Sequence, residues 1–225
     1  MLGLRTCKKD GSSYGGFKWS LEVGAIITAH DWNSKPECGG GLHFLPWGEG
    51  DAKLINWDDD SIGLVIEPIG DDVVEILNPA GKSKCRSAQV VMVGPVKDCA
   101  TYIYEHGGAG KLVNGCTATA GDGGTATAGE YGTATAGEYG TATAGEYGTA
   151  TASDGGTATA GRCGTATAGR SGTATAGDEG TIIIKHWNGK RYKFTIAYVG
   201  EDGIEPNVKY CLDDDGKFIK AEVAA

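Results

Sequence analysis

Residues 116–179 read CTATAGDG, GTATAGEY, GTATAGEY, GTATAGEY, GTATASDG, GTATAGRC, GTATAGRS and GTATAGDE. These eight octads follow one another without an insertion or a deletion. Self-similarity at a short fixed period is typical of solenoids, in which each unit packs only against its neighbours. The 39 glycines of this 225-residue chain therefore indicate a tight turn in every repeat rather than a disordered or collagen-like segment.

Each octad contains one short strand and one corner. Thr and Ala alternate over four residues, which predicts a strand with two different faces. We expect the Gly after the strand to supply a positive φ at the corner. Eight residues are too few to close a coil, so two octads form one 16-residue coil and the eight octads form about four coils. We favour Ala inside, for instance Ala126 and Ala128, because Ala has no polar atom that needs a buried partner. The opposite choice, with Thr125 and Thr127 inside and their hydroxyls bonded along the stack, stays open.

The octads divide the chain into three parts. Residues 1–110 have the composition of a globular β-rich domain, residues 116–180 form the solenoid, and residues 181–225 form a β-hairpin cap. A cap is expected because an open end of the stack would recruit other strands. The predicted fold class is mainly β: an N-terminal β-rich (α+β) domain, then a short β-solenoid with two octads per coil, then a C-terminal antiparallel cap.

Strand patterns also predict the elements on either side of the solenoid. In the N-terminal domain, strands are expected at 17–23, 25–29, 42–44, 53–57, 63–68, 73–77 and 88–93, and one helix at 96–105. Residues 107–115 are a linker or the lead into the first coil. In the cap, strands are expected at 181–187, 192–199, 208–212 and 217–223, with a hairpin turn at Asn188-Gly189.

Charge and cysteine usage exclude several classes of protein. The formal net charge is −9 and the sequence pI is about 4.9, which argues against direct binding of nucleic acid through a basic surface. The seven cysteines are widely spaced without a CxxC pair, so the sequence predicts no metal site, and no motif predicts a cofactor. No signal peptide and no membrane-spanning segment is evident, so we expect a cytoplasmic protein with reduced thiols and no membrane partner.

The repeat GTATAGEY resembles the Thr-rich octads of bacterial ice-nucleation proteins, which pair octads into 16-residue coils. It is still more similar to TATAG arrays in phage and prophage proteins, which often end in a segment like VGEDGIEPNV at 199–208. The stretch GGGLHF at 39–44 is also similar to a motif of a phage domain. The repeat and C-terminal resemblances cover about half of the chain. They imply a phage-type solenoid protein that blocks a host defence system such as CRISPR–Cas, and they supply no mechanism.

The last two residues of each octad, mostly polar, are the predicted contact points for a partner. If octads alternate sides, the acidic ones form two ladders at rung spacing, where like charges repel. One hypothesis is that these rows imitate nucleic-acid phosphates and occupy a basic groove of a defence protein; the alternative is that corners merely need polar residues. The tyrosines beside the acids either form an interface core or shield backbone. The predicted partner-binding residues are Asp122, Glu130, Tyr131, Glu138, Tyr139, Glu146, Tyr147 and Asp154.

In the N-terminal domain, His30, His43, Trp32, Trp47 and Trp57 are the chemically richest residues. A Trp in a small β-rich domain usually lies in the core, although one that lines a pocket can stack on a nucleotide base. Neither His30 nor His43 has a neighbouring motif typical of a metal ligand or a catalytic base. His106, at the end of the predicted helix, is expected to bond a terminal carbonyl.

The sequence thus favours a non-enzymatic binding protein that inhibits a bacterial defence complex by steric or charge-based contact. Self-association of the solenoid into a homodimer is a further expectation. Three alternatives stay open: a virion or tail-fibre component, an enzymatic or nucleotide-binding N-terminal domain on a solenoid spacer, and an ice-binding protein. Four coils present hydroxyls over less than about 20 Å, which is short for ice nucleation.

Overall fold

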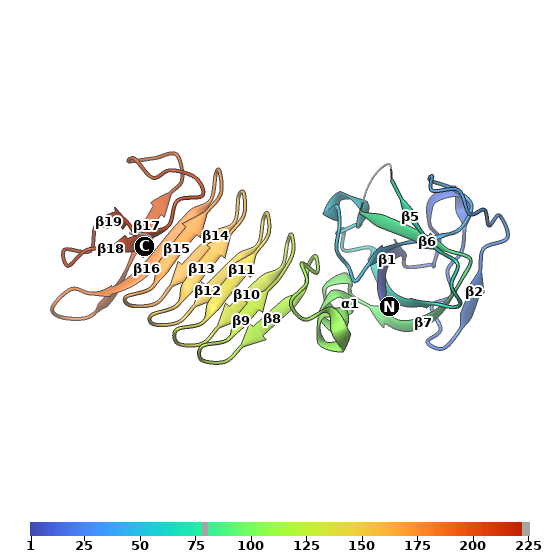
Figure 1. The fold of residues 1–225 in the computed structure, drawn as a ribbon, viewed down its shortest axis with the longest axis horizontal. Helices are drawn as coiled ribbons and strands as arrows, with labels where there is room; N and C mark the ends of the chain where they lie inside the picture. The colour runs from blue at the N-terminus through green and yellow to red at the C-terminus, as the bar shows by residue number, and fades with distance from the viewer. Residues whose placement is uncertain (78–80, 222–225) are drawn as a thin grey trace. The chain divides into compact units, whose positions relative to one another are not determined.

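The computed structural model describes residues 1–77 and 81–221, which fall into two compact units, Met1–Cys116 and Thr117–Ala225 (Figure 1). The first unit contains a seven-stranded antiparallel sheet with strand order β2-β7-β4-β1-β3-β6-β5. Its strands are β1 (Gly3–Lys8), β2 (Ile26–Thr28), β3 (Leu42–Pro46), β4 (Ser61–Pro68), β5 (Val73–Ile76), β6 (Lys82–Cys85) and β7 (Ser87–Gly94). Its helical segments are α1 (Val96–Ile103), the π-helical turn η3 (Tyr104–Gly108) and two short 3₁₀ turns, η1 (Tyr14–Gly16) and η2 (Ala52–Leu54).

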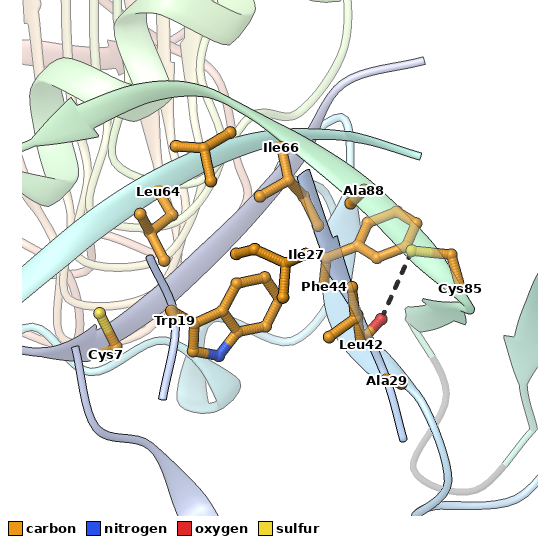
Figure 2. Close-up of a cluster of buried hydrophobic side chains, with 11 residues drawn as sticks. Cys7, Trp19, Ile27, Ala29, Leu42, Phe44, Leu64, Ile66, Cys85 and Ala88 are labelled. Atoms are coloured by element: carbon orange, nitrogen blue, oxygen red, sulfur yellow. Dashed lines mark hydrogen bonds between the residues drawn. The ribbon is translucent and has the colours of Figure 1, made fainter. Parts of the chain in front are cut away.

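The core of this unit is a cluster of apolar side chains from several strands (Figure 2). Trp19 is its largest member and is buried, and Leu64 and Ile66 of β4 are fully buried. α1 packs against β4 at Gly63, where a Cβ would lie 2.9 Å from the Cα of Val96. Gly63 therefore permits the helix to approach the sheet closely enough to bury its apolar side.

Several predicted elements of this unit are observed, and others are wrong. The helix and the strands near 25–29, 42–44, 63–68, 73–77 and 88–93 are present with shifted ends. Residues 17–23 and 53–57 form no strand: Trp19 belongs to irregular chain that packs into the core, and the Nε1–H of Trp57 donates to the carbonyl of Ala52 at 3.1 Å beside η2. The strands β1 and β6 were not predicted, because each contains two Lys or Arg residues and is a strand only through pairing on both sides.

Residues 107–115 belong to the first unit rather than forming an open linker. Val113 is fully buried, and Asn114 is buried with its side-chain N–H donating to the carbonyl of Gly50 at 2.9 Å. A side-chain bond of this kind is not visible in the local pattern, since Gly50 lies 64 residues earlier.

In the second unit the octads alternate between two parallel sheets, which Figure 1 shows as stacked coils. The first sheet contains β8 (Thr117–Ala120), β10 (Thr133–Ala136), β12 (Thr149–Ala152) and β14 (Thr165–Ala168). The second sheet contains β9 (Thr125–Thr127), β11 (Thr141–Ala144), β13 (Thr157–Ala160) and β15 (Thr173–Ala176). Each strand pairs in register with the strand 16 residues away, as Thr133 does with Thr117. The predicted 16-residue coil is confirmed.

The Ala side chains point into the coils, as predicted. Ala126, Ala128 and Ala142 are fully buried, whereas Thr125 on the same strand as Ala126 is exposed. Methyl groups let the two sheets approach closely and carry no polar atom into the interior. Because such an interior buries little apolar surface, the backbone ladders between coils must contribute much of the stability.

The corners depart from the prediction in the role of glycine. Positive φ falls on the eighth residue of the octad rather than on the Gly after the strand: Tyr131, Tyr147 and Cys163 have φ of 55°, 53° and 53°. The Gly after the strand is required by stacking instead. A Cβ at Gly161 would lie 2.7 Å from the backbone N of Glu146 in the preceding coil.

The C-terminal antiparallel cap is confirmed. It contains β16 (Thr181–Trp187), β17 (Tyr192–Tyr198), β18 (Tyr210–Leu212) and β19 (Phe218–Lys220). β16 continues the first sheet in parallel register with β14, so that Ile182 and Ile184 replace the buried Ala side chains. β17 then pairs antiparallel with β16, and β18 pairs antiparallel with β15 and β19. Of the strand predicted at 217–223, residues 222 and 223 lie outside the described residues.

Candidate functional site

The corner residues lie on two edges of the solenoid. Edge one carries residues 122–123, 138–139, 154–155 and 170–171, and edge two carries residues 130–131, 146–147, 162–163 and 178–179. Backbone hydrogen bonds join the corners along each edge, for example from the N–H of Tyr131 to the carbonyl of Glu146 at 2.9 Å. The ladder between coils therefore continues around the corners, which holds the outward side chains at fixed spacing.

On edge one, the predicted aspartates have structural partners. Asp122 Oδ1 accepts the backbone N–H of Glu138 at 2.9 Å, and Asp154 Oδ1 accepts that of Arg170 at 2.9 Å. Asp154 also lies 3.1 Å from the Nζ of Lys185 and 3.7 Å from the Nε of Arg170. The bond from the Arg170 backbone, with these cations, lowers the pKa of Asp154. The charge of Asp154 is thus compensated within the chain.

On edge two, Arg162 connects three successive coils. Its Nη2 donates to Glu146 Oε2 at 3.1 Å and to the hydroxyl of Tyr147 at 2.9 Å. Its guanidinium lies 5.1 Å from the centre of the Tyr147 ring, and its Nη1 lies 3.9 Å from Glu179 Oε2. The bonds to Tyr147 and Glu146 raise the pKa of Arg162. The predicted acidic ladder is therefore interrupted by a cation that touches the acids above and below it.

The three corner tyrosines are separated by the alternation of octads. Tyr131 and Tyr147 stack on edge two, with ring centres 5.1 Å apart and planes 8° apart. Tyr139 stands alone on edge one and is 77% exposed. Its ring covers Gly155, where a Cβ would lie 2.5 Å from the ring. Edge two therefore presents an ordered Tyr–Tyr–Arg surface, and edge one does not.

A second candidate surface, which the sequence analysis did not predict, lies on the cap. We define the cap face as the exposed apolar side chains of β16 and β17: Trp187, Tyr192, Phe194, Ile196 and Tyr198. Each is more than half exposed, and cross-strand pairing places Trp187 opposite Tyr192. β17 is also the last strand of its sheet. The alternation of large apolar residues predicts a strand with one apolar face, but only the structure shows that this face is uncovered.

A cavity of about 930 Å³ opens in the N-terminal unit. Arg5 of β1 lies in its wall, with the guanidinium 5.7 Å from the centre of the Trp19 ring. Among the described residues, Arg5 has no side-chain hydrogen bond or ion pair, and its buried Nε has no acceptor. Burial lowers the pKa of Arg5. The remaining charged side chains of the wall are Lys18, Lys82 and Asp31.

A fully buried lysine supports one wall of this cavity. The Nζ of Lys84 donates to Asn33 Oδ1 at 3.1 Å and to the carbonyls of Glu37 and Gly39 at 3.0 and 2.8 Å. The backbone N–H of Gly39 donates in turn to Nε2 of His43 at 3.2 Å. This nitrogen accepts a hydrogen bond, so it carries no proton and the ring is neutral. Burial, followed by the charges of Lys82, Arg5 and Lys84, lowers the pKa of His43 to about 4.

The aromatic residues chosen from the sequence take different positions. Trp32, Trp47 and Trp57 are each half-buried, and the fully enclosed tryptophan is Trp19, to which the sequence analysis gave no role. The expected bond of His106 is confirmed, since its Nδ1 lies 2.8 Å from the carbonyl of Tyr102. His30 and His43 both line the cavity, together with Arg5 and Lys82. No local motif could have joined these residues, because they come from distant segments.

No family model, curated protein or solved structure matches this chain. Within residues 1–77 and 81–221, no helix is long and apolar enough to cross a membrane. The same described residues contain no group of three or more His, Cys, Asp or Glu side chains that could hold a metal ion.

Proposed function

We propose that this chain is a non-enzymatic, phage-type binding protein that inhibits a bacterial defence complex in the host cytoplasm, with edge two as its contact surface. One observation carries the choice of surface: the stacked pair Tyr131 and Tyr147, with Arg162 bonded against it. Tyr and Arg dominate interface hot spots, and side chains held in place before binding lose less conformational entropy on association. The target class is supported by the resemblance of the repeat to TATAG arrays of phages.

The geometry favours aromatic and steric contact over imitation of phosphates. Arg162 compensates Glu146 and Glu179, and Lys185 compensates Asp154, so the acids form no continuous negative row. In this proposal, Glu130 and Glu138 add long-range attraction to a basic partner. Exposed charges at the rim of an interface mainly affect the association rate and its salt dependence.

Phage plating on bacterial strains that each carry one defence system, CRISPR–Cas among them, tests this function. We expect expression of the chain to restore plating of a targeted phage on at least one strain. Tyr131→Ser combined with Tyr147→Ser should abolish most of the restoration, whereas Tyr139→Ser on edge one should retain it at equal protein abundance. Restoration in no strain contradicts the function, and full activity of the double variant contradicts edge two as the surface.

We also propose that two copies of the chain pair through the cap face. A half-exposed aromatic side chain offers about 100 Å² for burial, so two cap faces would bury on the order of 1,000 Å². This total reaches the lower limit of specific interfaces. One cap face, at about 500 Å², is as large as the largest apolar patch of a typical monomer. Because both copies present the same patch, a two-fold dimer satisfies both at once.

Sedimentation velocity of the full chain at micromolar concentration tests the dimer. We expect the wild type to sediment as a dimer and Phe194→Lys combined with Ile196→Lys to sediment as a monomer. Lys193→Ser changes the other face of the same strand and should leave the dimer intact. A monomeric wild type, or a dimeric double variant, would rule out pairing through the cap face.

A further inference from the structure

The charge of the cavity in the N-terminal unit is opposite to that of the chain. Three cationic side chains, Arg5, Lys18 and Lys82, line the cavity with one carboxylate, Asp31, although the chain has a formal net charge of −9. Lys82 forms no ion pair with a described residue. A local excess of cations in a concave site attracts anions.

Two buried donors of residues that line the cavity have no acceptor among the described residues. They are the Nε–H of Arg5 and the Nε1–H of Trp19, whose side chains contact each other. Figure 2 shows the indole nitrogen of Trp19 on the edge of the ring away from Ile66. A buried guanidinium without a partner is destabilising. An anion that draws Arg5 toward the cavity would supply the acceptors that the described residues lack.

The other basic groups near the cavity already have structural roles. Lys84 donates its three hydrogen bonds to the loop at residues 33–39, and His43 accepts from Gly39. The pKa of His43 is lowered to about 4 by burial and by Lys82, Arg5 and Lys84, which is consistent with a positive potential in the cavity. The Nζ of Lys18 lies 4.0 Å from Asp10 Oδ2, so Arg5 and Lys82 are the groups left to bind an anion.

We infer that this cavity binds a nucleotide, with its phosphate groups at Arg5 and Lys82 and its base against Tyr14. The planar guanidinium of Arg matches the geometry of phosphate oxygens. The volume of about 930 Å³ is in the range of sites for ligands of this size and is far larger than a phosphate ion needs. Tyr14 is 98% exposed on a turn whose next residues, Gly15 and Gly16, have positive φ, so its ring is free to stack on a base.

Isothermal titration of the full chain with AMP, ADP and ATP tests this inference, with inorganic phosphate and citrate as anions that lack a base. We expect at least one nucleotide to bind in the micromolar range and more tightly than either comparison anion. Lys82→Met should weaken binding about tenfold, through loss of a charged contact. Tyr14→Ser should weaken it about fivefold or more, through loss of stacking.

Lys190→Met, in the cap, is the matched control and should bind like the wild type. Arg5→Gln should abolish binding if its melting temperature shows that it folds. If it does not fold, the inference is tested by Lys82→Met and Tyr14→Ser alone. No nucleotide binding at millimolar concentration would overturn the inference. Equal binding of phosphate or citrate, or wild-type affinity in both Lys82→Met and Tyr14→Ser, would overturn it as well. None of these outcomes depends on edge two, so the proposed inhibition of a defence complex stands or falls separately.

Discussion

Replacing Gly161 by Ala tests whether coil stacking requires the glycine after each strand. The added Cβ would lie 2.7 Å from the backbone N of Glu146 and 2.8 Å from the carbonyl carbon of Gly145. Backbone atoms cannot rotate away, so the coils must shift, and overpacking of this kind costs about 1–3 kcal/mol. Ser153 already carries a Cβ at the same octad position, which shows that one coil can adjust. We therefore expect a loss of about 2 kcal/mol rather than complete unfolding.

Gly121→Ala is the matched control for this substitution. Gly121 has the same octad position in the first coil, but apart from its two chain neighbours no described residue has an atom within 4 Å of its Cβ position. The change should leave the free energy of unfolding unchanged or raise it by about 0.5 kcal/mol through the unfolded chain. Urea unfolding of the full chain, followed by hydrogen exchange of peptides from residues 141–168, measures the solenoid separately from the N-terminal unit. Equal effects of the two substitutions would refute the stacking explanation.

Ile184→Ala should lower the free energy of unfolding by about 3 kcal/mol in the same urea experiment, because Ile184 is 1% exposed and its truncation opens a cavity beneath the cap. A loss below about 1 kcal/mol would mean that the cap is not packed as described. The pKa of His43 is lowered to about 4, so below pH 6.5 the unfolded chain binds a proton that the folded chain does not. The free energy of unfolding of the N-terminal unit should therefore fall by about 2 to 3 kcal/mol as the pH falls from 6.5 to 4. In thermal melts, His43→Gln should lack this loss of stability and His30→Gln should keep it. A wild type that is equally stable at both pH values would contradict the lowered pKa of His43. Arg162→Met should reduce restoration of phage plating whereas Arg170→Met on edge one should not, and the reverse result would move the contact surface to edge one.

The two halves of the chain differ in how far their folds could be predicted. The octads repeat one local pattern, so the strand positions and the 16-residue spacing follow from counting residues. In the N-terminal unit, β1 and β6 carry charged residues and become strands only through neighbours distant in sequence. The polarity of Lys84 predicts an exposed side chain, but this side chain is fully buried. It is stable there because three acceptors from the loop at 33–39 surround its amine.

The candidate sites show the same division. The alternation of octads predicted that acidic corners lie on two edges, because rung partners are 16 residues apart. It did not predict that Arg162 would bond Glu146 and Tyr147, since this depends on side-chain conformation at the corner.

Period-two alternation and side-chain polarity are local properties, and they were sufficient to predict the solenoid, its coil length and its Ala interior. The cap face and the cavity needed the folded chain. Whether an apolar strand face is covered depends on which segments reach it. Likewise, Arg5, Trp19 and Lys82 line one cavity only because the fold brings together residues that no sequence pattern links.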